Sequence, residues 1–208
     1  MKPEHVPARI PHGERARLLG LARRAIHSYV LDQNIPDSDE CPIPGERRGA
    51  FVTLHLARRL RGCIGRLDSL DPLDTLVAVC AVLAASRDPR FPPVQRHELD
   101  ALEIEISLLT PPEAVTAAEA LARFEVGVHG LAVTLDISRG LLLPQVAAEQ
   151  GWNALRFLQE TCRKAGLPPD AWRDPETRIE LFTAEVFSEA QHPADSPAAA
   201  DLKSTPHK

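Results

Sequence analysis

The sequence contains few aromatic residues, and this limits the kind of core that the chain can build. Phe, Trp and Tyr together make up 4% of the 208 residues, although 44% of the residues are hydrophobic. The core must therefore consist mainly of aliphatic side chains. No stretch is long and apolar enough to cross a membrane, and the N-terminus lacks the apolar centre of a signal peptide. We therefore expect a cytoplasmic protein that does not associate with membranes.

A large excess of positive charge is also absent. The formal net charge is -5 at pH 7, which is not typical of a protein with a basic surface for nucleic acid. Arginines do cluster locally, at residues 47–48 and 58–59 and at Arg61. These clusters are compatible with a small anionic ligand.

Cysteine is scarce and shows no metal-binding spacing. The four cysteines, Cys41, Cys63, Cys80 and Cys162, are far apart and include no CxxC pair. We therefore expect free thiols in a reducing compartment and no metal site. The glycine-rich phosphate loops, Walker motifs, HExxH and GxSxG are absent as well, so no sequence motif predicts a cofactor.

Hydrophobic periodicity and turn-forming residues divide the chain into elements. The pattern predicts helices over residues 14–31, 72–86 and 144–166, and strands within 49–67, over 101–109, on either side of a turn at 138–140, and over 177–187. Residues 1–13 are expected to be flexible and residues 190–208 disordered, which leaves a single domain over residues 14–189. Hairpin-like strands that do not alternate strictly with helices predict an α+β fold with mostly antiparallel sheets.

Cys63 lies in the segment LRGCIGRL, residues 60–67, which combines a thiol with glycine and arginine. Gly62 and Gly65 would give a ligand access to the backbone. Arg61 would share the face of Cys63 in a strand, where its charge would stabilise the reactive thiolate. The simpler interpretation is a small buried side chain, which is how most unpaired cysteines behave. Cys80 and Cys162 are interpreted as packing residues.

A nucleophilic cysteine usually needs a base, and two histidines are candidates. Either Leu54 or His55 would lie opposite Cys63, depending on whether Leu60 belongs to the hairpin turn, because a shift of one residue exchanges the two faces of a strand. His129, which is flanked by glycines in GVHGL, is the second candidate. Its alternative role is that of a turn histidine with a local hydrogen bond.

Two further groups of residues have a structural and a functional interpretation. Arg90 and Phe91 lie on a loop stiffened by proline, either as an anion clamp or as a plug in which Phe91 is buried and Arg90 caps carbonyl groups. Glu103 and Glu105 project from one face of the predicted strand 101–109, together with Ser107. Ordinary surface alternation explains these acids better than a paired-carboxylate site does.

Five segments together resemble a known family. LRGCIG, DPRFPPV, LEIEISLLT, VGVHGL and LLPQVAAEQGW occur in this order between residues 60 and 152, and the resemblance covers roughly residues 14–189. They are similar to the AMMECR domain family, whose bacterial and archaeal members are called AmmeMemoRadiSam system protein A. The resemblance implies an α+β fold of two unequal lobes with antiparallel sheets and packed helices. It also implies a Memo-type protein and a radical SAM protein as partners.

The resemblance places the site but supplies no reaction. Its signature hexapeptide matches residues 60–65, and the expected ligand-binding residues are Arg61, Gly62, Ile64, Gly65, Arg90 and Gln145. Two functions remain open. The protein binds a small molecule or a partner segment in a cleft lined by this hexapeptide, or it is a cysteine-dependent enzyme in which Cys63 is the nucleophile or covalent carrier and His129 moves protons.

Overall fold

The computed structural model describes residues 10–34 and 48–191, which form two compact units. The first unit comprises the described residues up to Leu108 and those from Glu185 onward, and the second unit comprises Leu109–Ala184. The chain passes from one unit to the other at the end of β3 (Leu102–Leu109) and again within the last strand, β7 (Arg178–Ser188). Cys41, most of the predicted flexible N-terminal segment and nearly all of the predicted tail lie outside the described residues.

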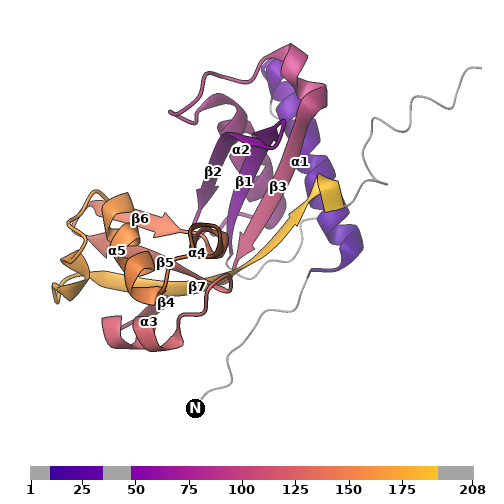
Figure 1. The fold of residues 1–208 in the computed structure, drawn as a ribbon. Helices are drawn as coiled ribbons and strands as arrows, with labels where there is room; N and C mark the ends of the chain where they lie inside the picture. The colour runs from indigo at the N-terminus through magenta and orange to yellow at the C-terminus, as the bar shows by residue number, and fades with distance from the viewer. Residues whose placement is uncertain (1–9, 35–47, 192–208) are drawn as a thin grey trace, which may run out of the picture. The chain divides into compact units, whose positions relative to one another are not determined.

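The first unit packs two helices against one face of an antiparallel sheet (Figure 1). Its elements are α1 (His12–Asp32), β1 (Gly49–Leu56), β2 (Arg59–Arg66), α2 (Leu73–Ser86), a 3-10 helix at Arg96–Ala101 and β3 (Leu102–Leu109). The sheet has the order β2-β1-β3, and residues 185–188 of β7 follow β3. Strand β2 is therefore an edge strand.

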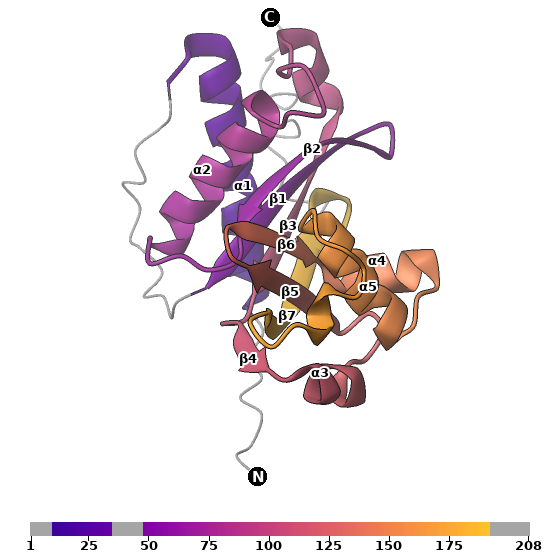
Figure 2. The same ribbon diagram turned by 90° about the vertical axis from the view of Figure 1, so that its left-hand side faces the viewer.

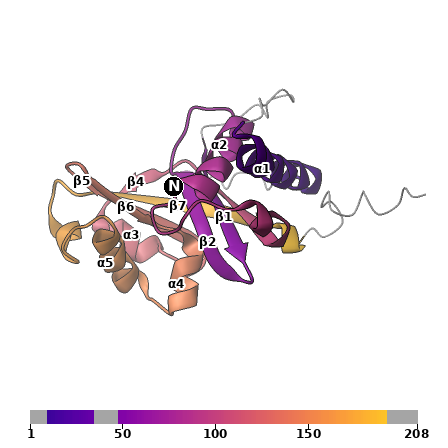
Figure 3. The same cartoon turned by 90° about the horizontal axis from the view of Figure 1, so that it is seen from above.

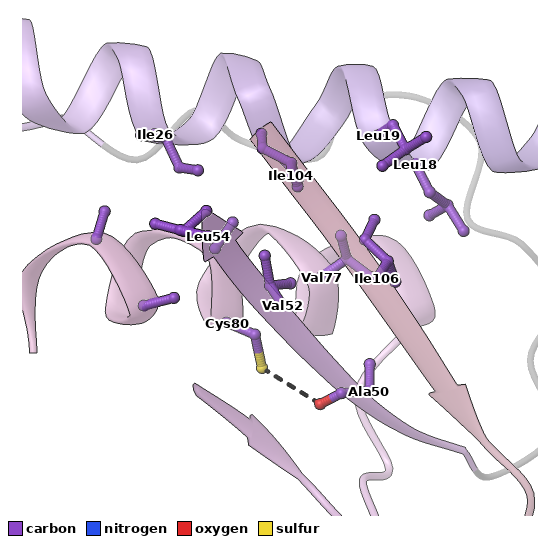
Figure 4. Packing of buried hydrophobic residues seen from close by; sticks show 14 of the residues in the cluster. Leu18, Leu19, Ile26, Ala50, Val52, Leu54, Val77, Cys80, Ile104 and Ile106 are labelled. Atoms are coloured by element: carbon purple, nitrogen blue, oxygen red, sulfur yellow. Dashed lines mark hydrogen bonds between the residues drawn. The ribbon is translucent and has the colours of Figure 1, made fainter. Parts of the chain in front are cut away.

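The core of the first unit lies between the helices and this sheet (Figure 4). Val52 and Leu54 of β1 and Ile104 and Ile106 of β3 are buried against residues of both helices. Helix α2 has buried apolar residues around most of its circumference. Because side chains alternate along a strand, the residues between these core positions face away from the helices.

The second unit has its own antiparallel sheet. Its elements are β4 (Glu113–Val115), α3 (Ala117–Arg123), β5 (His129–Leu135), β6 (Ser138–Leu142), α4 (Pro144–Gln150), α5 (Ala154–Lys164), a 3-10 helix at Ala171–Arg173 and most of β7. Strand β5 pairs with both β6 and β7, and β4 pairs with β7. The helices lie on one side of strands β5 to β7 (Figure 3).

The predicted α+β class with mostly antiparallel strands is confirmed, and α1, β3 and β7 match their predicted ranges closely. The predicted helix over residues 144–166 is wrong, because it is divided into α4 and α5. Gly151 ends α4 in a left-handed conformation with φ 64°, and the side chain of Asn153 caps α5. The turn predicted at residues 138–140 lies at Asp136 and Ile137, and Ser138 already begins β6.

Candidate functional site

The hairpin of β1 and β2 sets the surroundings of Cys63. Its turn consists of Ala57 and Arg58, which both have positive φ. The register shifts beside Leu54, which pairs with Gly62, whereas His55 pairs with Leu60 and leaves Arg61 as the extra residue of a bulge.

Thr53 therefore lies opposite Cys63. Both predicted registers, with Leu54 or His55 in this position, are wrong. The turn begins one residue earlier than expected, which alone would place Val52 opposite Cys63, and the bulge moves the pairing back by one residue to Thr53. Neither feature carries the usual glycine or asparagine signal of a tight hairpin.

The glycines beside Cys63 allow protein atoms to approach the backbone closely. A Cβ at Gly62 would lie 2.2 Å from the carbonyl oxygen of Ala84 in α2, and a Cβ at Gly65 would lie 2.3 Å from the ring of Phe51. The neighbouring space is thus filled by α2 and by an aromatic ring. This corrects the expectation that the glycines keep the backbone open to a ligand.

The sulfur of Cys63 is partly buried and hydrogen-bonded. Thr53 Oγ1 donates to Cys63 Sγ over 3.3 Å. Burial raises the pKa of the Cys63 thiol, and this effect outweighs the lowering by the Thr53 hydrogen bond and by the charge of Arg90. The group is therefore mainly a protonated thiol at neutral pH, which is the less reactive form.

Asp88 and Arg90 occupy the outer edge of β2 beside Cys63. The Asp88 carboxylate accepts hydrogen bonds from the backbone N–H of Cys63 at 2.8 Å and from the Arg90 guanidinium at 2.6 and 2.9 Å. Arg90 Nη2 also donates to the carbonyl oxygen of Cys63 at 3.4 Å. The ion pair thus meets both backbone groups that an edge strand would otherwise leave unpaired at this residue.

The two side chains of this ion pair differ in their exposure to solvent. The Asp88 side chain is 2% exposed, and hydrogen bonds from Arg90 hold the pKa of its carboxyl well below the usual range. The Arg90 side chain is 47% exposed, and its guanidinium lies 5.5 Å from the centre of the partly buried Phe91 ring. A cation is therefore held in place by a buried carboxylate while its outer side faces solvent.

Arg61 has another role than the one expected from its spacing. Its guanidinium donates to both carboxylate oxygens of Glu98, at 2.8 and 2.9 Å, and to the carbonyl oxygen of Pro92 at 2.9 Å. The cation that lowers the pKa of Cys63 is Arg90. The prediction that Arg61 stabilises the thiolate is therefore wrong, and Arg61 instead ties the proline-rich loop and the following 3-10 helix to β2.

Two polar residues of β3 lie on the face of the sheet that also carries Cys63. The negative charge of Glu105 is one of the influences that raise the pKa of the Cys63 thiol. Ser107 was expected at the surface but is 0% exposed, and among the described residues its Oγ has no hydrogen-bond partner. Alternation alone identifies the face of Ser107 but not its burial.

The other expected site residues lie elsewhere. Ile64 points to the core of the first unit and packs against it. His129 and Gln145 belong to the second unit. His129 Nδ1 accepts a hydrogen bond from the backbone N–H of Glu125 at 3.1 Å, as the alternative of a turn histidine predicts, and its role as a base stays a prediction. Gln145 is the second residue of α4, and its buried Oε1 has no hydrogen-bond partner among the described residues.

The described parts of the chain offer neither a preformed metal centre nor a membrane span. Within residues 10–34 and 48–191, no three His, Cys, Asp or Glu side chains are grouped so that they could hold a metal ion. No helix in these same ranges is long and apolar enough to cross a bilayer. The polar groups that contact Cys63 are the Thr53 hydroxyl and the Asp88–Arg90 pair.

Comparisons with known proteins agree on one family. The AMMECR1 family model matches residues 19–187. The chain is 46% identical over 187 residues to a protein of Methanothermobacter thermautotrophicus, covering 88% of this chain and 97% of that protein. Protein TK0174 of Thermococcus kodakarensis is 46% identical over 181 residues, 83% of this chain and 88% of its own length. The crystal structure of uncharacterized protein PH0010 from Pyrococcus horikoshii superposes with a TM-score of 0.80 at 44% identity, covering 86% of this chain and 93% of that chain.

Proposed function

The chain belongs to the AMMECR1 family, and we propose that its first unit binds an anionic group at Arg90, beside Cys63. The group belongs to a small molecule or to a segment of a partner protein. One observation carries the proposal: the Arg90 guanidinium is fixed by the buried Asp88 carboxylate and is nevertheless 47% exposed.

The fixed guanidinium supports binding for an energetic reason. An arginine that is already ordered loses little side-chain entropy when it meets a ligand. Its planar N–H groups match the oxygens of a carboxylate or a phosphate. Because Asp88 already neutralises much of the charge, the ligand shares the guanidinium with this residue and needs further contacts for tight binding.

The state of the thiol favours binding over catalysis. The pKa of Cys63 is raised, and the hydrogen bond at its sulfur comes from a hydroxyl rather than from a base. A cysteine nucleophile normally has a lowered pKa or an adjacent base. The alternative, an enzyme that uses Cys63 as nucleophile with His129 as proton carrier, is favoured only by the partial exposure of the sulfur and by the nearby charge of Arg90.

The resemblance to the AMMECR domain family is the ground for the proposed partners. We place the protein in the cytoplasm, where it acts with a Memo-type protein and a radical SAM protein by holding a small molecule or a partner segment for them. Co-purification of the three proteins, with and without Arg90→Gln, tests this step. The variant is expected to weaken the association if the bound group belongs to a partner, and to leave it unchanged if the group belongs to a small molecule.

The binding proposal itself is tested by mass spectrometry of small molecules and peptides retained by the purified protein. Arg90→Gln is expected to lose the retained anionic species. Arg87→Gln is the matched control, because Arg87 is an exposed arginine in the same loop and is expected to retain them. Equal retention by the wild type and both variants, or equal loss in both variants, would contradict binding at Arg90.

A further inference from the structure

The second unit carries a row of polar residues across three strands. Thr134 of β5 pairs with Arg139 of β6 on one side and with Arg178 of β7 on the other. Figure 2 shows β6, β5 and β7 side by side. Leu131 and Val133 of β5 belong to the core that the helices cover, so Thr134 and its row lie on the opposite face of the sheet.

A buried carboxylate lies in the next row of the same face. Ala132 of β5 pairs with Glu180 of β7, and the side chain of Glu180 is 4% exposed. Arg178 Nη2 donates to Glu180 Oε1 at 2.6 Å, and Arg139 Nη2 donates to Glu180 Oε2 at 3.4 Å. One negative charge is thus shared by two guanidinium groups, so the three side chains together have a net positive charge.

Both arginines are accessible despite this shared partner. Their side chains are 50% exposed at Arg139 and 63% exposed at Arg178. Each uses Nη2 for Glu180, and no further protein acceptor among the described residues hydrogen-bonds to either guanidinium. Most of the N–H donors of both groups therefore face solvent.

One arginine would be enough to neutralise Glu180. The second arginine adds a charge that the carboxylate does not balance, and Thr134 adds a hydroxyl between the two. Strands are spaced by about 4.8 Å, so the Cα atoms of Arg139 and Arg178 are separated by roughly 10 Å, a span that two arginine side chains can close from both ends. Glu180 orders both guanidinium groups in advance, which lowers the entropy lost when an anion binds.

We propose that Arg139, Thr134 and Arg178 form an oxyanion site on the second unit, which takes the phosphate or carboxylate group of a small molecule. Glu180 is a positioning residue in this site, since its carboxylate contacts the two arginines rather than the ligand. The site is separate from the one proposed at Arg90, because none of its residues belongs to the first unit. Failure of one proposal therefore leaves the other intact.

Isothermal titration at low ionic strength tests the site with two probes, inorganic phosphate and citrate. Saturable binding of either probe is expected, and the tighter one identifies the preferred oxyanion. Arg139→Gln and Arg178→Gln are each expected to weaken binding by about tenfold, as loss of a charged hydrogen bond implies. Arg139→Lys keeps the charge but loses the fork of donors, and an intermediate affinity is expected.

Arg156→Gln is the matched control. Arg156 lies in the same unit, its side chain is also 50% exposed, and it pairs with Glu160 at 2.8 Å. The Arg156→Gln variant should bind both probes with an affinity within about twofold of the wild type, a change in binding free energy well below 1.4 kcal/mol. Arg139→Gln and Arg178→Gln each leave Glu180 with one arginine. Circular dichroism should confirm that both variants are folded, and Arg139→Lys decides if Arg139→Gln is not. Absence of saturable binding in the wild type, or equal weakening in Arg156→Gln and the two site variants, would overturn the proposal.

Discussion

Thr53 faces Cys63 across the β1–β2 hairpin, and its hydroxyl donates to the sulfur over 3.3 Å. The backbone N–H of Cys63 points the other way and donates to Asp88. In an antiparallel pair, residues whose backbone groups point outward bring their side chains closest together. The same local register thus explains the contact of the thiol with Thr53 and the contact of the backbone with Asp88.

Thr53→Val should raise the pKa of the Cys63 thiol further, because the Thr53 hydrogen bond is one of the influences that lower it. Valine keeps the shape of threonine but removes the donor. Alkylation of Cys63 at fixed pH, followed by peptide mass spectrometry, should therefore become slower. Thr134→Val in the second unit is the control, and the same slowing there would show that the effect does not come from the Thr53 hydroxyl.

Cys63→Ser should leave stability nearly unchanged, whereas Cys80→Ser should lower it. Cys80 is 1% exposed in the core, where burial raises the pKa of its thiol to about 11. A serine hydroxyl without a good partner there costs about 1–3 kcal/mol. At residue 63 the new hydroxyl meets Thr53 and solvent. Thermal or urea unfolding measures the stability of both variants. An equal loss of stability in the two variants would show that residue 63 is a purely structural position.

Asp88→Asn should destabilise the protein in a pH-dependent way. The folded pKa of Asp88 lies below its ordinary value of about 3.9, so its charge stabilises the fold at neutral pH, and this stabilisation is lost as the pH falls below that value toward the folded pKa. We expect a loss of about 1–3 kcal/mol at pH 7 and a smaller difference from the wild type near pH 3.

Asp100→Asn is the control for this measurement, because Asp100 is an exposed acid of the 3-10 helix. Its unfolding free energy at pH 7 should stay within about 0.5 kcal/mol of the wild type. A difference between wild type and Asp88→Asn that stays constant from pH 7 to pH 3 would contradict the role assigned to the Asp88 charge.

Gly62→Ala should destabilise the first unit, because the added Cβ would overlap the carbonyl oxygen of Ala84, an atom fixed in the backbone of α2. Such overpacking costs about 1–3 kcal/mol. Gly13→Ala in α1 is the opposite case, since nothing lies within 4 Å of a Cβ there, and alanine should stabilise the helix slightly. Urea unfolding that gives both variants the same midpoint would refute the close approach of β2 to α2.

Periodicity identified α1 and β3 because each carries one continuous apolar face. It could not identify the register at Cys63, since Ala57 and Arg58 adopt left-handed conformations without the residues that usually signal them. The bulge at Arg61 is not indicated by any residue type in the sequence either.

The composition of the hexapeptide indicated Cys63, but Asp88 was not selected. Its carboxylate binds a backbone N–H that lies 25 residues earlier in the chain, and a sequence does not indicate which backbone N–H a side chain will bind. Arg90 was found on its loop, yet only the structure shows that it, rather than Arg61, supplies the charge beside the thiol.

The pKa of the Cys63 thiol distinguishes a cysteine in a binding site from an activated nucleophile. The rate of alkylation of Cys63 in the wild-type protein, resolved from the other cysteines by peptide mass spectrometry, would be followed from pH 6 to pH 11. We expect a midpoint above the ordinary cysteine value of about 8.5, because burial raises the pKa of the Cys63 thiol. A midpoint below about 7 would show an activated thiolate, and it would refute binding without catalysis in favour of cysteine-dependent catalysis.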